Sequence, residues 1–386
     1  MGNSKLAFQD IDVLTPDGWV KDATVLMEEG HFVQIDSNPL PQGFVAQNAT
    51  GLRMLPGIVD IHGDAFERMI CPRPGVTFPL EMAIAENDRA LLSSGITTFY
   101  YSITDSFEPG LRSRATARQM IEIILKGKDH LRANSQIHIR HEQANTADFD
   151  ELCEWIETRK VTLLSLNNHL PPSTDDETLI RYTKGLRQRI KLSDLEIRAL
   201  IEQALEQESE GLQQLEKLVL QAQAAQVPVA SHDDDSAGKV ALSAKRGVAI
   251  AEFPASIDLA AQSQAYGAAV LMGAPNLVRG GSHVGFMSVE AAAKARVLDC
   301  LCSDYHYPSL FHAPFKMAEM GLMEFADAWS LVSRHPAKAV GLGDRKGAIA
   351  PGLEADFLLV KPEESLPSAI AAVYIQGKEV ARFTGG

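Results

Sequence analysis

The sequence predicts an α/β fold: a closed (β/α)8 barrel with a small composite β domain built from both chain ends. Three observations lead to this prediction. Apolar, strand-like runs alternate with helical stretches through the middle of the chain. There are eight such runs, the number that a closed barrel needs. Both ends of the chain carry short strands and turns without intervening helices.

The two chain ends have the same character. Near the start, strand-like runs at 19–27 and 31–35 flank a Glu-Glu-Gly turn at 28–30. Near the end, strand-like runs at 356–360, 372–375 and 379–381 include a tight turn at 376–378. We expect residues 1–53 and 342–386 to form one β domain, and residues 54–341 to form the barrel.

The eight barrel strands follow from apolar runs that end in polar residues. We predict them at 57–62, 96–102, 136–142, 161–168, 227–232, 247–253, 268–273 and 298–304. The interval 172–225 is a long insertion. Its later part, 193–224, carries Leu, Ile and Ala at helical spacing among many Glu and Gln, so we predict one or two amphipathic helices there.

Composition limits the possible partners. The net charge is −14, and no basic tract offsets it, which argues against nucleic acid and anionic membranes as partners. The four cysteines in 386 residues do not suggest a disulfide framework. The N-terminus lacks the pattern of a secretory signal, and no 18-residue apolar run occurs, so we expect a cytoplasmic protein.

The strongest chemical signal lies at the end of the first predicted barrel strand. The run LPGIVDIHGD at 55–64 ends in His62 and Asp64. Alternate residues of a strand share a face, so these two side chains point the same way. An imidazole beside a carboxylate suits a divalent cation such as zinc or manganese.

Other predicted strands end in residues that could complete such a site. The third ends in Glu142, the fourth is followed by His169, the fifth ends in His232 and the eighth ends in Asp304. Active sites of α/β barrels lie at the C-terminal ends of the strands, so these side chains should meet at one mouth. His138 and Arg140 share a strand face with Glu142, and we expect them to fill the barrel interior or to orient Glu142.

These strand ends resemble the amidohydrolase superfamily, which has a TIM-barrel fold. Within it, the chain is most similar to the diphosphatases of phosphonate catabolism, which release pyrophosphate from a ribose 5-triphosphate that carries a methylphosphonate. The segments that carry the resemblance are 55–57, 71–74, 94–98, 230–234, 272–283, 303–305 and 347–356.

The resemblance implies a set of metal ligands and a catalytic residue. The ligands would hold two divalent ions, most simply zinc, with manganese or iron as alternatives, and Glu142 would bridge them. Asp304 would take a proton from the attacking water and return it to the leaving group. The implied metal set is His62, Asp64, Glu142, His169, His232 and Asp304.

The implied substrate is a small phosphorylated molecule, and candidate binding residues lie in loops on the same barrel face. They are Arg68, Arg73, Arg279, Ser282, His283 and Tyr305. Arginine forks suit phosphoryl oxygens. Two alternatives stay open: hydrolysis of a C–N bond, by a cyclic amidase or deaminase, and a non-catalytic barrel homologue. A homo-oligomer is also possible.

Overall fold

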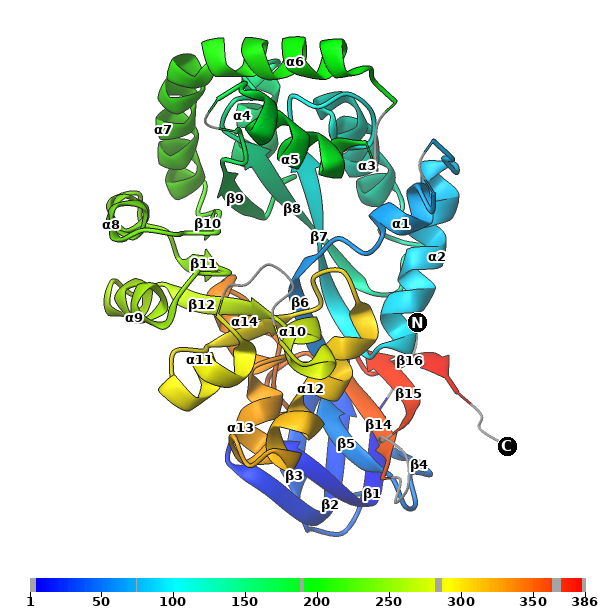
Figure 1. Ribbon diagram of the computed structural model, residues 1–386. Helices are drawn as coiled ribbons and strands as arrows, with labels where there is room; N and C mark the ends of the chain where they lie inside the picture. The colour runs from blue at the N-terminus through cyan, green and yellow to red at the C-terminus, as the bar shows by residue number, and fades with distance from the viewer. Residues whose placement is uncertain are drawn as a thin grey trace.

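A computed structural model describes residues 5–73, 75–171, 173–187, 191–281, 287–362 and 369–383. Its centre is a near-closed barrel of eight parallel strands that neighbour one another in chain order (Figure 1). The predicted fold class is confirmed, and each predicted barrel strand overlaps an observed one. The strands are β6 (Ile58–Gly63), β7 (Ile96–Asp105), β8 (Asn134–Glu142), β9 (Leu163–Asn167), β10 (Val229–His232), β11 (Ile250–Glu252), β12 (Ala269–Gly273) and β13 (Cys300–Cys302).

The barrel strands are apolar because helices cover their outer faces while side chains fill the interior. All ten residues of β7 are buried. No helix in the described segments has both the length and the apolar composition of a membrane span. The helices are α1 (Glu67–Ile70), α2 (Leu80–Ser93), α3 (Arg114–Lys126), α4 (Phe149–Glu157), α5 (Asp176–Leu186), α6 (Asp194–Glu206), α7 (Glu208–Ala224), α8 (Ala237–Lys245), α9 (Ile257–Ala265), α10 (Ala274–Arg279), α11 (Val289–Ala295), α12 (Tyr307–Glu319), α13 (Phe325–Ser330) and α14 (Arg334–Ala339), with a 3₁₀ turn η1 (Gly110–Arg112).

The insertion between β9 and β10 contains α5, α6 and α7, and it lies at the end of the molecule opposite the β domain (Figure 1). The helix α6 begins at a capping box: the Ser193 side chain accepts from the backbone of Glu196, whose side chain accepts from the backbone of Ser193. The amphipathic helices predicted within 193–224 are α6 and α7.

The second sheet joins the two ends of the chain. Its order is β16-β15-β14-β5-β1-β2-β3, with β4 paired to β1, so C-terminal strands lie beside N-terminal ones (Figure 1). Phe8 packs edge-on against Phe357 and Tyr374, at ring-centroid distances of 5.5 and 5.6 Å. The strands are β1 (Lys5–Thr15), β2 (Gly18–Glu28), β3 (His31–Asp36), β4 (Val45–Gln47), β5 (Arg53–Pro56), β14 (Phe357–Lys361), β15 (Ala369–Ile375) and β16 (Lys378–Arg382).

A buried ion cluster lies between the last barrel helix and β14. The ammonium group of Lys346, whose side chain is 1% exposed, lies 2.7 Å from a Glu354 oxygen and 2.5 Å from an Asp356 oxygen. The backbone N–H of Gln376 donates to the other Asp356 oxygen at 2.8 Å. The cluster therefore ties the segment that leaves the barrel to the turn before β16.

Removing the central cation should destabilise the fold strongly. In Lys346→Met, two buried carboxylates lose their shared partner, and breaking a buried ion pair in this way costs about 3–5 kcal/mol. The matched control is Arg345→Ala, because Arg345 also pairs with Glu354 but its side chain is 56% exposed. The control should cost less than about 1 kcal/mol. Denaturant unfolding followed by circular dichroism measures both, and equal losses would contradict this assignment.

Candidate functional site

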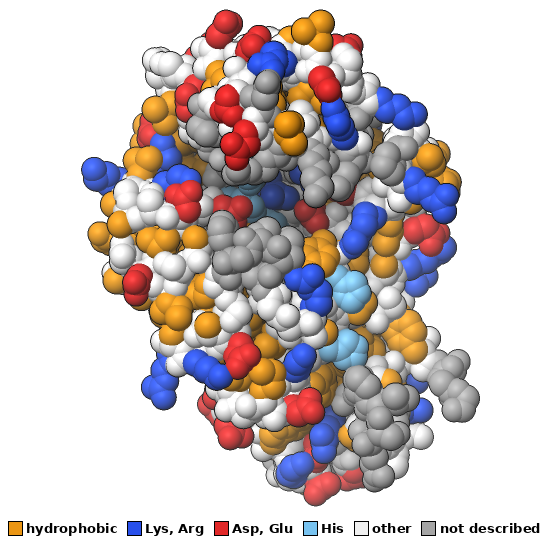
Figure 2. Space-filling model, viewed as in Figure 1, with side chains coloured by type: hydrophobic (Ala, Val, Ile, Leu, Met, Phe, Trp, Pro, Cys, Tyr) orange, Lys and Arg blue, Asp and Glu red, His pale blue; other side chains and the backbone are white. Residues whose placement is uncertain are grey.

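Three residues of the predicted site meet where the first and last barrel strands join. A parallel bridge links Gly63 to Asp304. The backbone N–H of Asp304 donates to the carbonyl of His62 at 3.0 Å, and the N–H of Asp64 donates to the carbonyl of Asp304 at 2.9 Å. Barrel closure thus places the motif after β6 against the residue after β13. Acidic, basic and histidine side chains gather in a hollow near the middle of this face (Figure 2).

The backbone around this mouth is strained at the ends of the strands. Asp233, Phe253 and Asp304, which lie one, one and two residues beyond the end of a barrel strand, have φ of 54°, 56° and 52°. Aspartate tolerates this left-handed conformation, whereas for a bulky aromatic residue it is rare and costs about 1–3 kcal/mol. The ring of Phe253 packs edge-on against the imidazoles of His62 and His232, with centroids 5.0 and 5.3 Å away. This packing offsets the strain.

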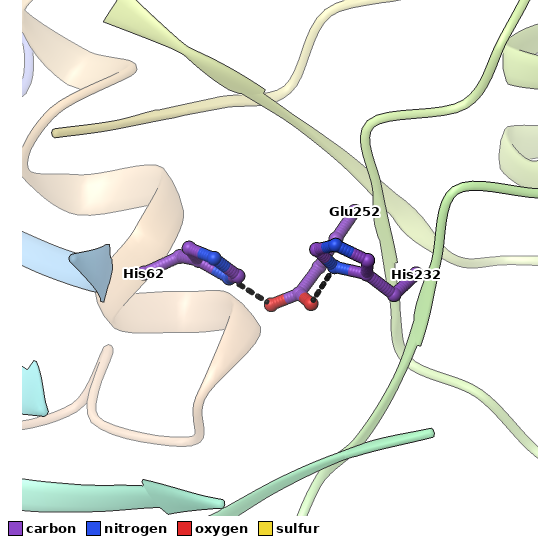
Figure 3. A group of neighbouring side chains, drawn as sticks. All are labelled: His62, His232 and Glu252. Carbon is purple, nitrogen blue, oxygen red and sulfur yellow. Dashed lines mark hydrogen bonds and ion pairs between the residues drawn. The ribbon is translucent and has the colours of Figure 1, made fainter. Parts of the chain in front are cut away.

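Glu252, the last residue of β11, also belongs to the site. Its side chain is fully buried. One oxygen lies 2.8 Å from Nδ1 of His62, and the other lies 3.1 Å from Nδ1 of His232 (Figure 3). The hydroxyl of Ser165 donates to the second oxygen at 2.7 Å. One carboxylate therefore contacts imidazoles from two strands, β6 and β10.

Glu252 is ionised in these surroundings. Burial alone would raise its pKa, but the interactions with the imidazoles of His62, His138 and His232 hold the pKa well below its ordinary value. Nε2 of His138 lies 3.7 Å from Glu252, and its Nδ1 lies 3.0 Å from the Ser102 hydroxyl. Burial lowers the pKa of His138 to about 3, so this ring is neutral.

A second carboxylate–imidazole pair lies at the mouth. Nδ1 of His169 lies 2.5 Å from one Glu142 oxygen, and the backbone N–H of His169 donates to the other at 3.0 Å. Burial would raise the pKa of Glu142, but the charge and hydrogen bonds of His169 lower it to about 2. In turn, the charge of Glu142 raises the pKa of His169 to about 9. The predicted role of Glu142 as a bridging ligand stays a prediction, because both its oxygens contact His169 here.

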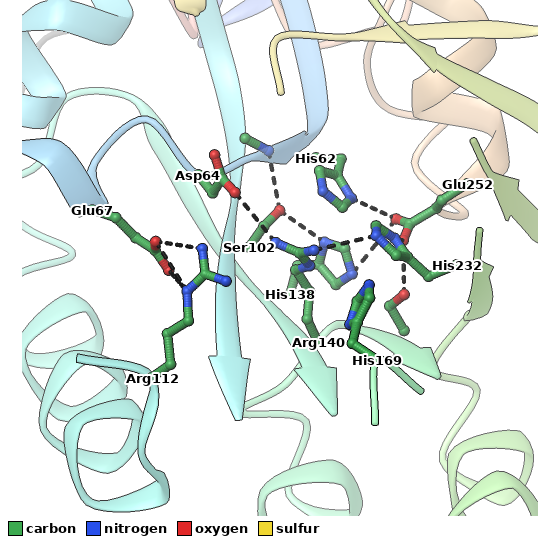
Figure 4. A network of polar contacts seen from close by, with 12 residues as sticks. His62, Asp64, Glu67, Ser102, Arg112, His138, Arg140, His169, His232 and Glu252 are labelled. Atoms are coloured by element: carbon green, nitrogen blue, oxygen red, sulfur yellow. Dashed lines mark hydrogen bonds and ion pairs between the residues drawn. The ribbon is translucent and has the colours of Figure 1, made fainter. Parts of the chain in front are cut away.

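Arg140 links two predicted ligands across the site (Figure 4). One terminal nitrogen donates to Asp64 at 3.2 Å, and the other lies 3.2 Å from Nε2 of His232. His138 and Arg140 are both buried, as expected of barrel-interior groups, and the expectation that they orient Glu142 stays a prediction. Side chains of one strand face lie at successive depths, so these two reach Ser102, Asp64 and His232, which lie beside them.

The arrangement offers donors that divalent metals prefer. Among the described residues, ligand-type atoms lie within 4.8 Å of one another in two groups: one is His62, His232 and Glu252, and the other is His169, His232 and Asp233. Imidazole nitrogens with carboxylate oxygens suit zinc, manganese or iron. The buried group is consistent with a metal site. It contains His62 and His232 of the predicted set, and the second group adds His169.

The other three predicted ligands, Asp64, Glu142 and Asp304, lie nearby but belong to neither group. Asp304 is a weaker acid than an ordinary aspartate. Burial, and then the charge of Asp64, raise its pKa to about 6. A carboxyl group with a pKa near the working pH is well placed to accept and return a proton.

Four of the predicted substrate residues are described by the structure, and two are not. Arg68, Arg73 and Arg279 are exposed, and Tyr305 is half-buried. The guanidinium of Arg279 donates to the Gly281 carbonyl at 3.3 Å. The two remaining residues, Ser282 and His283, are outside the residues that the structure describes.

Sequence reasoning missed Glu252. The signal was present, because Glu252 is the one charged residue of the predicted strand 247–253, which is otherwise apolar or glycine. A carboxylate there must be buried, and a buried carboxylate needs partners. Its partners come from strands that are distant in sequence, and so the pattern alone did not name them.

Known proteins share the sequence pattern and the fold. The profile of the amidohydrolase family matches residues 53–380. The chain is 32% identical to the alpha-D-ribose 1-methylphosphonate 5-triphosphate diphosphatase of Escherichia coli K12, over 87% of this chain and 90% of that protein.

Solved structures share the fold at much lower identity. One is N-acetylglucosamine-6-phosphate deacetylase from Pasteurella multocida, with a TM-score of 0.65 and 10% identity, covering 98% of this chain and 100% of that chain. Another is dihydropyrimidinase from Brevibacillus agri NCHU1002, with a TM-score of 0.57 and 16% identity, covering 98% of this chain and 95% of that chain.

Arg140 should compete with a metal ion for His232. A guanidinium can only donate, so it occupies the lone pair of Nε2 that a cation would use. Hydrogen bonds to charged groups are worth about 1.5–3 kcal/mol. We therefore expect Arg140→Met to bind zinc about tenfold more tightly or better, as measured by chelator competition. Arg112→Met is the matched control, since Arg112 donates to Glu67. An unchanged affinity in Arg140→Met would show that the guanidinium does not compete.

Proposed function

The chain belongs to the amidohydrolase family, and we propose that it is a metal-dependent diphosphatase that releases pyrophosphate from alpha-D-ribose 1-methylphosphonate 5-triphosphate in phosphonate catabolism. The observation that carries the proposal is the 32% identity to the Escherichia coli diphosphatase over nearly the whole of both chains. The family resemblance expected from the strand-end motifs is confirmed, and the chain is a hydrolase of this superfamily.

The site contains residues that could hold divalent metal. His62, His169 and His232 each have Nδ1 against a carboxylate, which leaves Nε2 for a cation. Carboxylates of Asp64 and Asp233 lie beside them as further oxygen donors. A bound divalent cation, with zinc as our first choice, would act as a Lewis acid for phosphoryl oxygens.

Asp304 is the residue that we assign to proton transfer. Its carboxyl group lies at the mouth where β13 ends, and its raised pKa keeps it close to balance between the two protonation states near neutral pH. In the proposed reaction it accepts a proton from the attacking water and returns it to the leaving oxygen. The base must be ionised, so turnover should fall as the pH drops below the pKa of Asp304.

Arginine side chains would neutralise the negative charges of the substrate that do not contact the metal ions. A triphosphate with a phosphonate brings several negative charges to a mouth already lined with carboxylates. Arg73 follows β6 and α1, and Arg279 ends the helix α10 that follows β12. Both segments follow the C-terminal end of a barrel strand, and guanidinium groups bind phosphoryl oxygens two at a time.

The direct test is the reaction itself. The zinc-loaded and manganese-loaded protein should release pyrophosphate from the ribose triphosphate, as followed by ³¹P nuclear magnetic resonance. A neutral cyclic amide is the comparison substrate, because many amidohydrolases cleave C–N bonds. Preference for the amide would overturn the diphosphatase proposal and leave the family assignment in place.

Replacing the proposed base should separate catalysis from metal binding. Asp304→Asn keeps the shape of the side chain, so fold and metal content should be unchanged. Turnover should fall by about 10²- to 10⁴-fold, the usual contribution of a positioned acid–base group. Steady-state kinetics and metal analysis of the same preparation give both quantities. Near-normal turnover would remove Asp304 from the chemical step.

Loss of either loop arginine should weaken use of the triphosphate. Each lost contact to a charged group costs about 1.5–3 kcal/mol, so kcat/KM should fall roughly 10- to 150-fold in Arg73→Ala and in Arg279→Ala. Metal content should not change. Arg89→Ala is the control, because Arg89 lies on the outer helix α2, with its side chain 73% exposed. Normal kcat/KM in both loop variants would exclude these arginines from substrate binding.

A further inference from the structure

We propose that Glu252 is a positioning residue that fixes the proton of two metal-binding imidazoles, His62 and His232, so that Nε2 of each ring is free for the cation. The inference rests on the proposed metal-dependent function, and it assigns a role to a residue that is not itself a ligand. Its basis is the hydrogen bonding of one buried carboxylate to rings from two different strands (Figure 3).

The protonation of both rings follows from the partner. Each carboxylate oxygen of Glu252 faces one ring nitrogen, and the second oxygen also accepts from the Ser165 hydroxyl, so both oxygens are placed as hydrogen-bond acceptors. Nδ1 of His62 and Nδ1 of His232, at 2.8 and 3.1 Å, must therefore carry hydrogen atoms and donate them.

The other side of the His232 ring gives an independent check. Nε2 of His232 lies 3.2 Å from a terminal nitrogen of Arg140. A guanidinium has no lone pair to offer, so Nε2 must be the acceptor and carry no proton. The ring is thus the neutral tautomer protonated at Nδ1, the form in which Nε2 can bind a metal ion.

The geometry argues against Glu252 as a ligand. Its oxygens already accept from His62, His232 and Ser165, and the carboxylate is fully buried below the rings. The oxygen of Asp233, in contrast, lies 3.7 Å from Nε2 of His232 and 3.8 Å from Nε2 of His169. Asp233 and the Nε2 atoms of His232 and His169 would therefore hold a cation, whereas Glu252 contacts the other ring nitrogen of His232.

The same pattern recurs at the third imidazole. His169 places Nδ1 against Glu142, which again leaves Nε2 facing the mouth. Phe253 supports the deeper pair, because its ring contacts both His62 and His232 while its backbone is held at a positive φ. Rotation of either ring would lose both a hydrogen bond and this packing.

Glu252→Gln tests the proposal because an amide cannot serve both rings. Its oxygen accepts from one Nδ1, but its NH₂ group can only donate to the other. That second ring must move its proton to Nε2, where it blocks metal binding. We expect zinc affinity to fall about 10- to 100-fold. X-ray absorption of the zinc-loaded variant should show one imidazole fewer than in the wild type.

The control carries the same substitution at a carboxylate without an imidazole partner. Glu67 pairs with Arg112, so Glu67→Gln should keep the zinc affinity of the wild type within about twofold and keep its imidazole count. If Glu252→Gln does not fold, as judged by circular dichroism, Glu252→Asp is the second variant. It keeps the charge but is one methylene shorter, so it cannot reach both rings and should also lose affinity and one imidazole.

The outcomes separate this inference from the proposed function. Wild-type protein that binds neither zinc nor manganese would overturn the metal-dependent function. Tight binding in the wild type, with equal affinity and an unchanged imidazole count in the Glu252 variant, would overturn only the positioning role. Lost affinity with an unchanged imidazole count would identify Glu252 as a ligand instead, and would also overturn the inference.

Discussion

The junction between the first and last barrel strands is the constraint on which the site depends. The segment after β6 and the segment after β13 exchange two backbone hydrogen bonds, through His62, Asp64 and Asp304. Gly63 permits this approach, since a Cβ atom there would lie 2.7 Å from Oγ of Ser303, the residue before Asp304. The same bonds that close the barrel thus hold two predicted ligands and the proposed base in fixed relation.

At two places in the structure, one buried charged group is shared by two partners of the opposite kind. In the β domain, one ammonium group is shared by Glu354 and Asp356. In the barrel, one carboxylate is shared by two imidazoles. An isolated buried charge would cost several kcal/mol, so each of these groups fixes the positions of partners that are distant in sequence. In the barrel, the partners fixed in this way are those that the proposed chemistry needs.

Much of the fold was predictable because strand and helix periods are local properties. Each of the eight predicted barrel strands overlaps an observed one, and the chain ends do form one sheet. The site was predictable to the extent that its residues end strands: His62, His169 and His232 take part in potential metal groups. The contacts of Arg140 with Asp64 and His232 were not predicted, because a position on a strand face does not give the depth at which a long side chain ends.

The sequence by itself determined which residues reach the mouth of the barrel. The apolar pattern gives both the alternation of side chains along each strand and the order of the strands in the chain. Only the tertiary structure decided which carboxylate contacts which imidazole. Glu252 lies 190 residues from His62, and their 2.8 Å contact depends on barrel closure and on the height of each strand end. Those contacts set the tautomer of each ring, and with it the atom that can bind a metal ion.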